Sequence, residues 1–154
     1  MRTTIFIFIF ICTAISVVVA QKRTITLTNS SWSPSVAVTP VTIVGNDYTS
    51  STITSTVNET LLSINSNGGY TIYVKKSDID WNADISLWVR RTGDGTSGGA
   101  ISTNVSFIQL TNLDQVLFTG NKDRDNVPIQ FEIRGLSVLL PAKQYKTSIV
   151  FTIL

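Results

Sequence analysis

The feature that most constrains this chain is its content of β-branched side chains. From Gln21 onward the sequence has 134 residues, of which 18 are Thr, 13 are Ile and 12 are Val. These side chains lose rotamer freedom in a helix and pack well on the pleated surface of a sheet. Because about a third of the residues are of this kind, the sequence predicts an all-β domain.

The order of polar and apolar residues agrees with that prediction. Gln130, Glu132 and Arg134 alternate with apolar residues, which is typical of a strand with one buried face. The same period of two continues from Thr147 to Ile153. Further strands are predicted near Thr24–Thr28, Val36–Val44, Thr52–Val57, Leu61–Ile64, Tyr70–Lys75, Ile85–Arg91, Asn104–Leu110 and Gln115–Phe118. We therefore expect a single antiparallel Ig-like β-sandwich of about nine or ten strands.

The first twenty residues have the pattern of a secretory signal peptide. Arg2 gives a positive start, an apolar run extends from Ile5 to Val19, and Ala20 offers a small residue for cleavage. The run is shorter than the ~20 apolar residues of a membrane-spanning helix, which favours cleavage over the alternative of an uncleaved anchor. We expect residues 1–20 to be a signal peptide and residues 21–154 to form one domain. That domain is expected to be secreted or held at the cell surface, meeting the membrane only during export.

Composition excludes several kinds of chemistry. The chain has no His, and its single Cys, Cys12, lies in the predicted signal peptide. A His/Cys zinc site, a Ser–His–Asp triad and a thiol nucleophile therefore cannot be built in the domain. The glycine-rich stretch 92–99 is followed by another strand-like run, not by the helix that a phosphate-binding loop needs. We expect no enzymatic activity and no cofactor.

Charge argues against nucleic acid as a partner. The 12 Lys and Arg residues face 10 Asp and Glu residues, so the formal net charge is only +2. The basic pairs are far apart in the sequence and form no run. A nucleic-acid-binding domain normally carries a concentrated basic patch.

The C-terminal run Leu140–Ile153 resembles the closing strand of secreted bacterial pilin-like and coat-like β-sandwich surface proteins. In those proteins the strand reads Pro-Ala-Gly, one residue, Tyr, and then alternating Thr and apolar residues; here Lys143 stands where Gly is preferred. Gly69–Val74 is similar to a strand in the middle of the same domains, and Ile85–Arg91 to an Arg-bearing strand that follows it. The resemblance implies a pilin-like sandwich that serves as a non-enzymatic, exported structural or adhesive subunit.

The same resemblance implies self-association or binding to other surface proteins, in some relatives by lending a strand to a neighbour. Arg23, Ile25 and Leu27 alternate with threonines directly after the predicted cleavage site. This run is the candidate assembly strand, since an extended segment can add to the edge of another sheet. The alternative, that it is the first strand of its own domain, is favoured because it offers only two apolar anchors.

Aromatic residues support an alternative function, a secreted carbohydrate-binding module. Trp81 and Trp88 are the candidate glycan contacts, because sugar rings stack on exposed aromatic faces. Trp88 alternates with Leu87 and Val89, so it points either outward or toward a second sheet. Ordinary core packing is the other interpretation of these residues.

An alternating acidic run matches only part of a calcium-binding loop. Oxygen-bearing residues occupy every second position at Asp78, Asp80, Asn82 and Asp84, the spacing of the first ligands in such a loop. Ala83 and Val89 stand where that loop needs Gly and a bidentate Glu. A solvated strand is therefore favoured over a weak calcium site, and we assign no metal ligands.

Three asparagines match the acceptor pattern for N-glycosylation. They are Asn29, Asn58 and Asn104, each followed two residues later by Ser or Thr. The pattern has meaning only in a host that carries the modifying machinery. Coincidence is the alternative in a chain this rich in Asn, Ser and Thr.

Overall fold

The structure is a computed structural model that describes residues 22–34, 52–103 and 105–154. These residues contain nine strands and no helix, which confirms the all-β prediction: β1 (Arg23–Thr28), β2 (Thr52–Thr54), β3 (Thr60–Ser66), β4 (Gly69–Asp80), β5 (Ser86–Arg91), β6 (Ile108–Gln109), β7 (Gln115–Asn121), β8 (Arg124–Arg134) and β9 (Lys146–Ile153). The predicted signal peptide and the strand predicted at Val36–Val44 lie outside the described residues. In the part of the chain that the structure describes, no helix is long and apolar enough to span a membrane.

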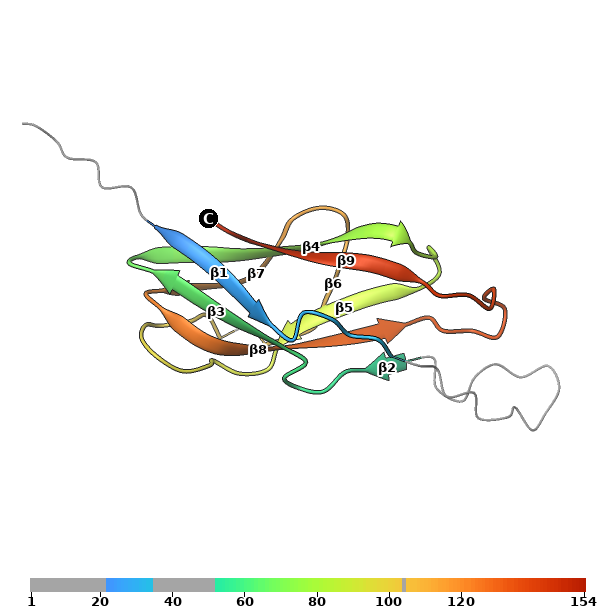
Figure 1. Ribbon diagram of the computed structural model, residues 1–154, viewed down its shortest axis with the longest axis horizontal. Coiled ribbons are helices and arrows are strands. Elements are labelled where there is room, and N and C mark those ends of the chain that lie inside the picture. The colour runs from blue at the N-terminus through green and yellow to red at the C-terminus, as the bar shows by residue number, and fades with distance from the viewer. Residues whose placement is uncertain (1–21, 35–51, 104) are drawn as a thin grey trace, which may run out of the picture.

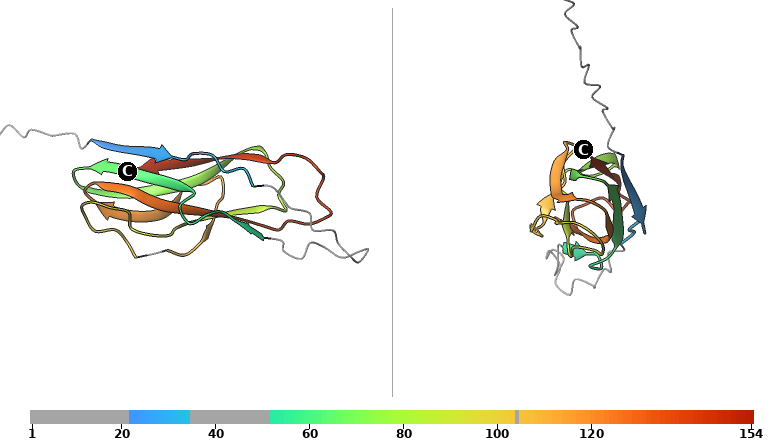
Figure 2. Two further views of the ribbon diagram at one scale, coloured as in Figure 1. Left: turned by 60° about the horizontal axis from the view of Figure 1, so that its bottom comes forward. Right: turned by 90° about the vertical axis from the view of Figure 1, so that its left-hand side faces the viewer.

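The strands form two antiparallel sheets that lie face to face (Figures 1 and 2). Sheet A has six strands in the order β1-β3-β8-β5-β6, with β2 also paired to β8. Sheet B has three strands in the order β7-β4-β9. Each sheet buries one face against the other, which is the layered arrangement of a β-sandwich.

The core follows from the alternation along the central strands. Apolar residues at every second position of β3, β4, β5 and β8 point between the sheets and are fully buried, among them Leu62, Ile72, Val74, Val89, Val127 and Ile129. On β7 a register shift against β4 interrupts the alternation. Leu117 and Phe118 are consecutive, yet both are buried, because a bulge turns two neighbouring side chains toward the same face.

The predicted polar face of β8 lies on the outside of sheet A. One of its residues, Gln130, is nevertheless buried, which is unusual for a polar side chain. Gln130 is only 5% exposed. Its Nε2 donates to the backbone oxygen of Ser55 at 2.8 Å, and its Oε1 accepts from Nε of Arg90 at 2.8 Å. The buried amide is therefore satisfied by partners at distant positions in the sequence.

Several strands differ in length from their predictions: β2 is shorter, β3 and β7 are longer, and β4 and β6 differ most. β4 continues past the predicted end at Lys75 to Asp80, because β9 pairs with it along that extension. β6 is reduced to Ile108–Gln109, within the predicted Asn104–Leu110. The chain crosses from one sheet to the other directly after β6. The N–H of Leu110 donates to Leu87 of β5 in sheet A, and the carbonyl of the following residue, Thr111, accepts from Lys76 of β4 in sheet B.

Candidate functional site

The sandwich has two sides, where the edge strands of the two sheets lie. One side carries β6 and β7, and we call it the closed side; the other carries β1 and β9, and we call it the open side. On the closed side the outer edge of β7 is paired with residues 100–102. The N–H of Ser102 bonds to the oxygen of Thr119 at 2.9 Å, and the N–H of Asn121 to the oxygen of Ala100 at 3.0 Å. This segment covers part of the β7 edge.

Two arginines hold the covering segment in place. Arg91, at the end of β5, is 1% exposed. Its guanidinium donates to the backbone oxygens of Gly93 and Ser102 and to the carboxylate of Asp94. Arg124 donates to the oxygen of Gly99. Since a buried guanidinium requires acceptors, these bonds fix the path of the chain from 93 to 102.

The glycines of the same segment permit its close approach to the start of β8. Thr96 and Asp125 exchange two backbone hydrogen bonds, at 2.7 and 2.9 Å. A Cβ added at Gly95 would lie 2.3 Å from the oxygen of Asp125, and one at Gly98 would lie 2.4 Å from the oxygen of Asp123. Both glycines also have positive φ, +69° and +49°, which other residues rarely adopt. The glycine-rich loop is therefore docked against the turn between β7 and β8.

Tyr70 is buried beside these arginines without a partner for its hydroxyl. The residue is 4% exposed, and within the described residues its hydroxyl makes no hydrogen bond. Burial raises the pKa of Tyr70, an effect that the charges of Arg124 and Arg91 oppose. A Cβ at Gly120 would lie 2.4 Å from the hydroxyl oxygen, so the glycine gives the ring its space.

On the open side, β1 and β9 lie next to each other at the edges of their sheets (Figure 1). β1 pairs with β3 from Arg23 to Thr28, and β9 pairs with β4 from Lys146 to Ile153. Among the described residues neither strand has a partner on its other edge. The open side therefore presents two unpaired strand edges side by side.

The core is incompletely covered along this side. Ile25 of β1 packs against the core without being buried, as do Ile149, Phe151 and Ile153 of β9. Leu27 is 41% exposed, whereas Leu62, its register partner on β3, is 0% exposed. Inward-facing apolar side chains thus remain in contact with water, which is unfavourable until something covers them.

The structure places the candidate assembly residues in β1 of their own sheet. Arg23, Ile25 and Leu27 stand in register with Ser66, Ile64 and Leu62 of β3. Their strand thus belongs to the open side. None of its six residues is buried, and the same is true of the eight residues of β9.

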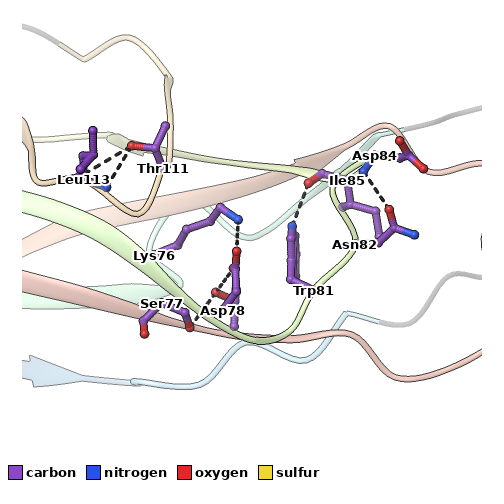
Figure 3. Close-up of polar contacts among 10 residues, drawn as sticks. Lys76, Ser77, Asp78, Trp81, Asn82, Asp84, Ile85, Thr111 and Leu113 are labelled. Carbon is purple, nitrogen blue, oxygen red and sulfur yellow. Dashed lines mark hydrogen bonds and ion pairs between the residues drawn. The ribbon is translucent and has the colours of Figure 1, made fainter.

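The two candidate glycan contacts lie on different surfaces. Trp88 is on the outer face of sheet A, where its Nε1 donates to Ser86 at 3.0 Å and the guanidinium of Arg134 lies 3.9 Å from its ring centre. Trp81 packs against the core and donates from Nε1 to the backbone oxygen of Ile85 at 2.8 Å (Figure 3). They do not form one platform, and Arg134 already covers one face of Trp88.

Three of the four alternating residues, Asp78, Asp80 and Asn82, engage other groups of the fold through their side chains. Asp78 pairs with Lys76 and accepts from the hydroxyl of Thr147 at 2.9 Å. Asp80 pairs with Lys143, and this hydrogen bond raises the pKa of the lysine. Asn82 accepts from the N–H of Asp84 at 2.8 Å, which closes a local turn (Figure 3). Within ranges 22–34, 52–103 and 105–154, no group of three or more His, Cys, Asp or Glu is placed to hold a metal ion.

Two of the three predicted glycosylation acceptors can be placed. Asn29 and Asn58 are exposed, whereas Asn104 lies outside the described residues. The two are linked through Thr60, which completes the acceptor pattern that begins at Asn58. The hydroxyl of Thr60 donates to the backbone oxygen of Asn29 at 2.7 Å.

A polar cleft was not foreseen from the sequence. It has a volume of about 590 Å³ and lies between the outer surface of β1 and β3, the glycine-rich loop and the turn before β8. Its residues come from four segments, so no local sequence motif predicts it.

Comparisons with known proteins add nothing to these observations, because no protein-family model, curated protein or solved structure matches the chain. The functional argument therefore rests on the residues and geometry described above.

Proposed function

We propose that this chain is a non-enzymatic, exported structural subunit with an Ig-like sandwich, and that it assembles when β9 of one copy pairs with β9 of another. The open side is the observation that carries the proposal. Unpaired edges and half-exposed core residues occur together there. The signal-like pattern of residues 1–20 supports export.

The hydrogen-bonding groups of β9 are available for an added strand. Thr71 and Leu154 exchange backbone bonds in both directions, at 2.9 and 3.1 Å. Bonded and non-bonded pairs alternate along an antiparallel ladder, and the register continues with Ile72 opposite Ile153. Residues 149, 151 and 153 therefore direct N–H and C=O groups away from β4. The same residues carry the half-exposed inward side chains.

Most of β9 lacks the features that protect an edge, since its ladder with β4 is irregular only at the start of the strand, opposite Asp78–Asp80. Natural edge strands are usually guarded by charges, prolines or bulges. The stretch from Thr147 to Ile153 contains no charged residue and no Pro, and Lys146 at the start is the only charge on the strand. An edge of this kind favours pairing with another strand.

A second copy of β9 fits the edge by symmetry. If a two-fold axis passes through Phe151, the N–H and C=O of Ile149 meet those of Ile153 of the second copy. Phe151 then lies opposite its own counterpart, an aromatic cross-strand pair that adds stability. Lys146 stays outside the paired stretch, so no like charges oppose each other. The two copies of sheet B become one continuous sheet.

The test is light scattering of the secreted chain over a range of concentrations. Mass should rise from monomer to dimer, and Ile149→Pro should remain monomeric because it removes an outward N–H. Ile149→Ala is the matched control: it loses the same apolar side chain, keeps the N–H, and should still dimerise. Proline is tolerated on an edge strand where its missing N–H faces outward, and melting curves verify that both variants fold.

Three outcomes would contradict β9 pairing. One is a wild-type monomer at the highest concentration, and another is a dimer that Ile149→Pro does not affect. The third is growth into filaments that deletion of Lys22–Thr28 abolishes, which would instead support donation of the strand with Arg23, Ile25 and Leu27. Export is checked separately by mass spectrometry, which should find a mature chain that begins at Gln21.

Glycan binding through Trp81 and Trp88 has less support. Arg134 covers one face of Trp88, and Trp81 is half-buried with its indole N–H bonded inside the chain. Stacking a sugar on either ring would displace those contacts.

A further inference from the structure

The cleft beside β1 is an open depression whose walls are fixed by backbone hydrogen bonds. Its volume of about 590 Å³ falls within the 300–1,000 Å³ that is usual for small-molecule sites. Backbone bonds between Thr96 and Asp125 fix one wall, and the bond from the N–H of Lys122 to the oxygen of Gly68 fixes the turn. The cleft therefore does not depend on side chains alone for its shape.

Strained backbone is concentrated around the same cleft. Ser97 and Lys122 have φ of 71° and 57°, and they are two of the four residues other than glycine with positive φ in the described chain. Both line the cleft. Such conformations cost free energy and persist where the surroundings impose them, often at binding sites.

Most residues of the lining are polar, although their apolar atoms contribute about half of its accessible surface. Hydroxyl, amide, ammonium and carboxylate groups converge from Thr24, Thr26, Asn65, Lys122, Asp123 and Asp125. Asp125 accepts from the hydroxyl of Ser97 at 2.7 Å, and Asp123 from the N–H of Ser66 at 2.7 Å. In the described part of the chain, the second oxygen of each carboxylate has no hydrogen-bond partner. These oxygens can accept from a ligand while the first ones keep the carboxylates in position.

We infer that this cleft binds a neutral saccharide of one or two rings. Two carboxylates against one ammonium give the lining a net negative charge, which disfavours anionic ligands. Polar and apolar atoms of the described lining residues share its surface about equally, which suits a saccharide, whose ring presents both hydroxyl groups and C–H faces, better than a lipid chain. Hydroxyl groups, which donate and accept, match the mixed lining, and charge-assisted bonds to carboxylates are the strong ones. Assembly is proposed through β9, none of whose residues lines the cleft, so this inference stands apart from assembly.

The test is a titration of the ¹⁵N-labelled secreted chain, followed by NMR, with methyl mannoside, N-acetylglucosamine, lactose and maltose. At least one should give saturable shifts at concentrations up to about 50 mM, which covers weak single-site binding. The shifts should be confined to amides near Thr24, Ser97 and 122–125. Asp125→Asn should weaken binding at least tenfold, because a charge-assisted bond is lost.

Matched variants separate binding from folding. Asp84→Asn changes an exposed carboxylate far along the chain from the cleft and should leave the affinity unchanged. Should Asp125→Asn lower the melting temperature, Thr24→Val replaces it as the test, with Thr119→Val on the exposed surface of β7 as its control.

Several results would overturn the inference. They are the absence of saturable shifts with all four saccharides, shifts centred on Trp88 that Asp125→Asn leaves unchanged, and tighter binding of glucuronate than of the neutral sugars. The last result would refute the argument from charge. None of them bears on dimerisation, which light scattering measures independently.

Discussion

The closed and open sides of this sandwich differ in how their strand edges are covered. Each side exposes the edges of two sheets. On the closed side, residues 100–102 pair with part of the β7 edge, and the buried guanidinium of Arg91 fixes the loop that leads to them. On the open side, the described chain supplies no cover for β9. The difference indicates that covering an edge within one chain requires a demanding loop, and on the open side the proposed pairing with another copy would replace that loop.

The largest contrast between the sides should appear in the core. Phe118 on β7 is 1% exposed, whereas Phe151 on β9 is half-buried. Phe118→Ala should lower the free energy of unfolding by about 3–5 kcal/mol. Phe151→Ala should cost about 1–2 kcal/mol in dilute solution, because less area leaves water on folding. Urea unfolding at low and high protein concentration measures both.

The dependence on protein concentration should also distinguish Phe151→Ala from Phe118→Ala. If β9 edges pair, the cost of Phe151→Ala should grow as the protein is concentrated, while the cost of Phe118→Ala should not. Equal costs for the two variants at low concentration would show that the open side is as well covered as the closed one.

The next largest effect is expected from replacing Arg91, the buried arginine of the closed side. Arg91→Ala should cost about 3 kcal/mol, since the oxygens of Gly93 and Ser102 lose their donor and the core loses a packed side chain. The neighbouring Arg90→Ala is the control, expected to cost about 1 kcal/mol, because its guanidinium is less enclosed and Gln130 keeps its bond to Ser55. Chemical denaturation compares them. Similar losses would refute a special role for the buried guanidinium.

A smaller effect should follow from the glycines of the closing loop. Gly95→Ala should destabilise the fold by about 2 kcal/mol, because it combines an unfavourable φ with a clash against the backbone of Asp125. At Gly69 a Cβ would meet nothing within 4 Å, and Gly69→Ala should change stability by no more than about 0.5 kcal/mol. Thermal melts of both variants provide the measurement. A docked loop predicts this asymmetry, and a freely moving loop predicts none.

The smallest effect concerns the unpartnered hydroxyl of Tyr70. At pH 7, Tyr70→Phe should leave stability within about 1 kcal/mol of the wild type, because no hydrogen bond is lost. Burial raises the pKa of Tyr70 in the folded chain, so the unfolded chain ionises first, near pH 10. Stability should therefore fall as the pH rises above about 10. Tyr70→Phe should lack that part of the loss in denaturation curves, and identical alkaline losses in both proteins would contradict it.

Strand positions were predictable from the sequence because alternation is local. The runs Ile129–Arg134 and Thr147–Ile153 indicate their buried faces through neighbouring residues alone. What alternation does not contain is the identity of the partner strand. That β1 and β9 become adjacent unpaired edges depends on the order of strands in both sheets. The same limit applies to Gln130, whose burial depends on Ser55 and Arg90.

The candidate site was predictable only in part. The pattern of Arg23, Ile25 and Leu27 identified a strand at the open side, because alternating side chains are visible locally. The cleft was not visible, because Thr24, Asn65, Ser97 and Asp125 converge from separate segments. The role of Arg91 was hidden for a similar reason: its acceptors follow in a loop whose path depends on glycine backbone angles.

The late position of β8 has a consequence for the timing of folding. β8 lies at the centre of sheet A, pairing with β2 and β3 on one edge and with β5 on the other. It spans residues 124–134, so the earlier strands leave the ribosome without the strand that joins them. Pairing over such sequence separations is slow. Under the proposed export this delay would be useful, since a polypeptide that has not yet collapsed into sheets can still be threaded across a membrane.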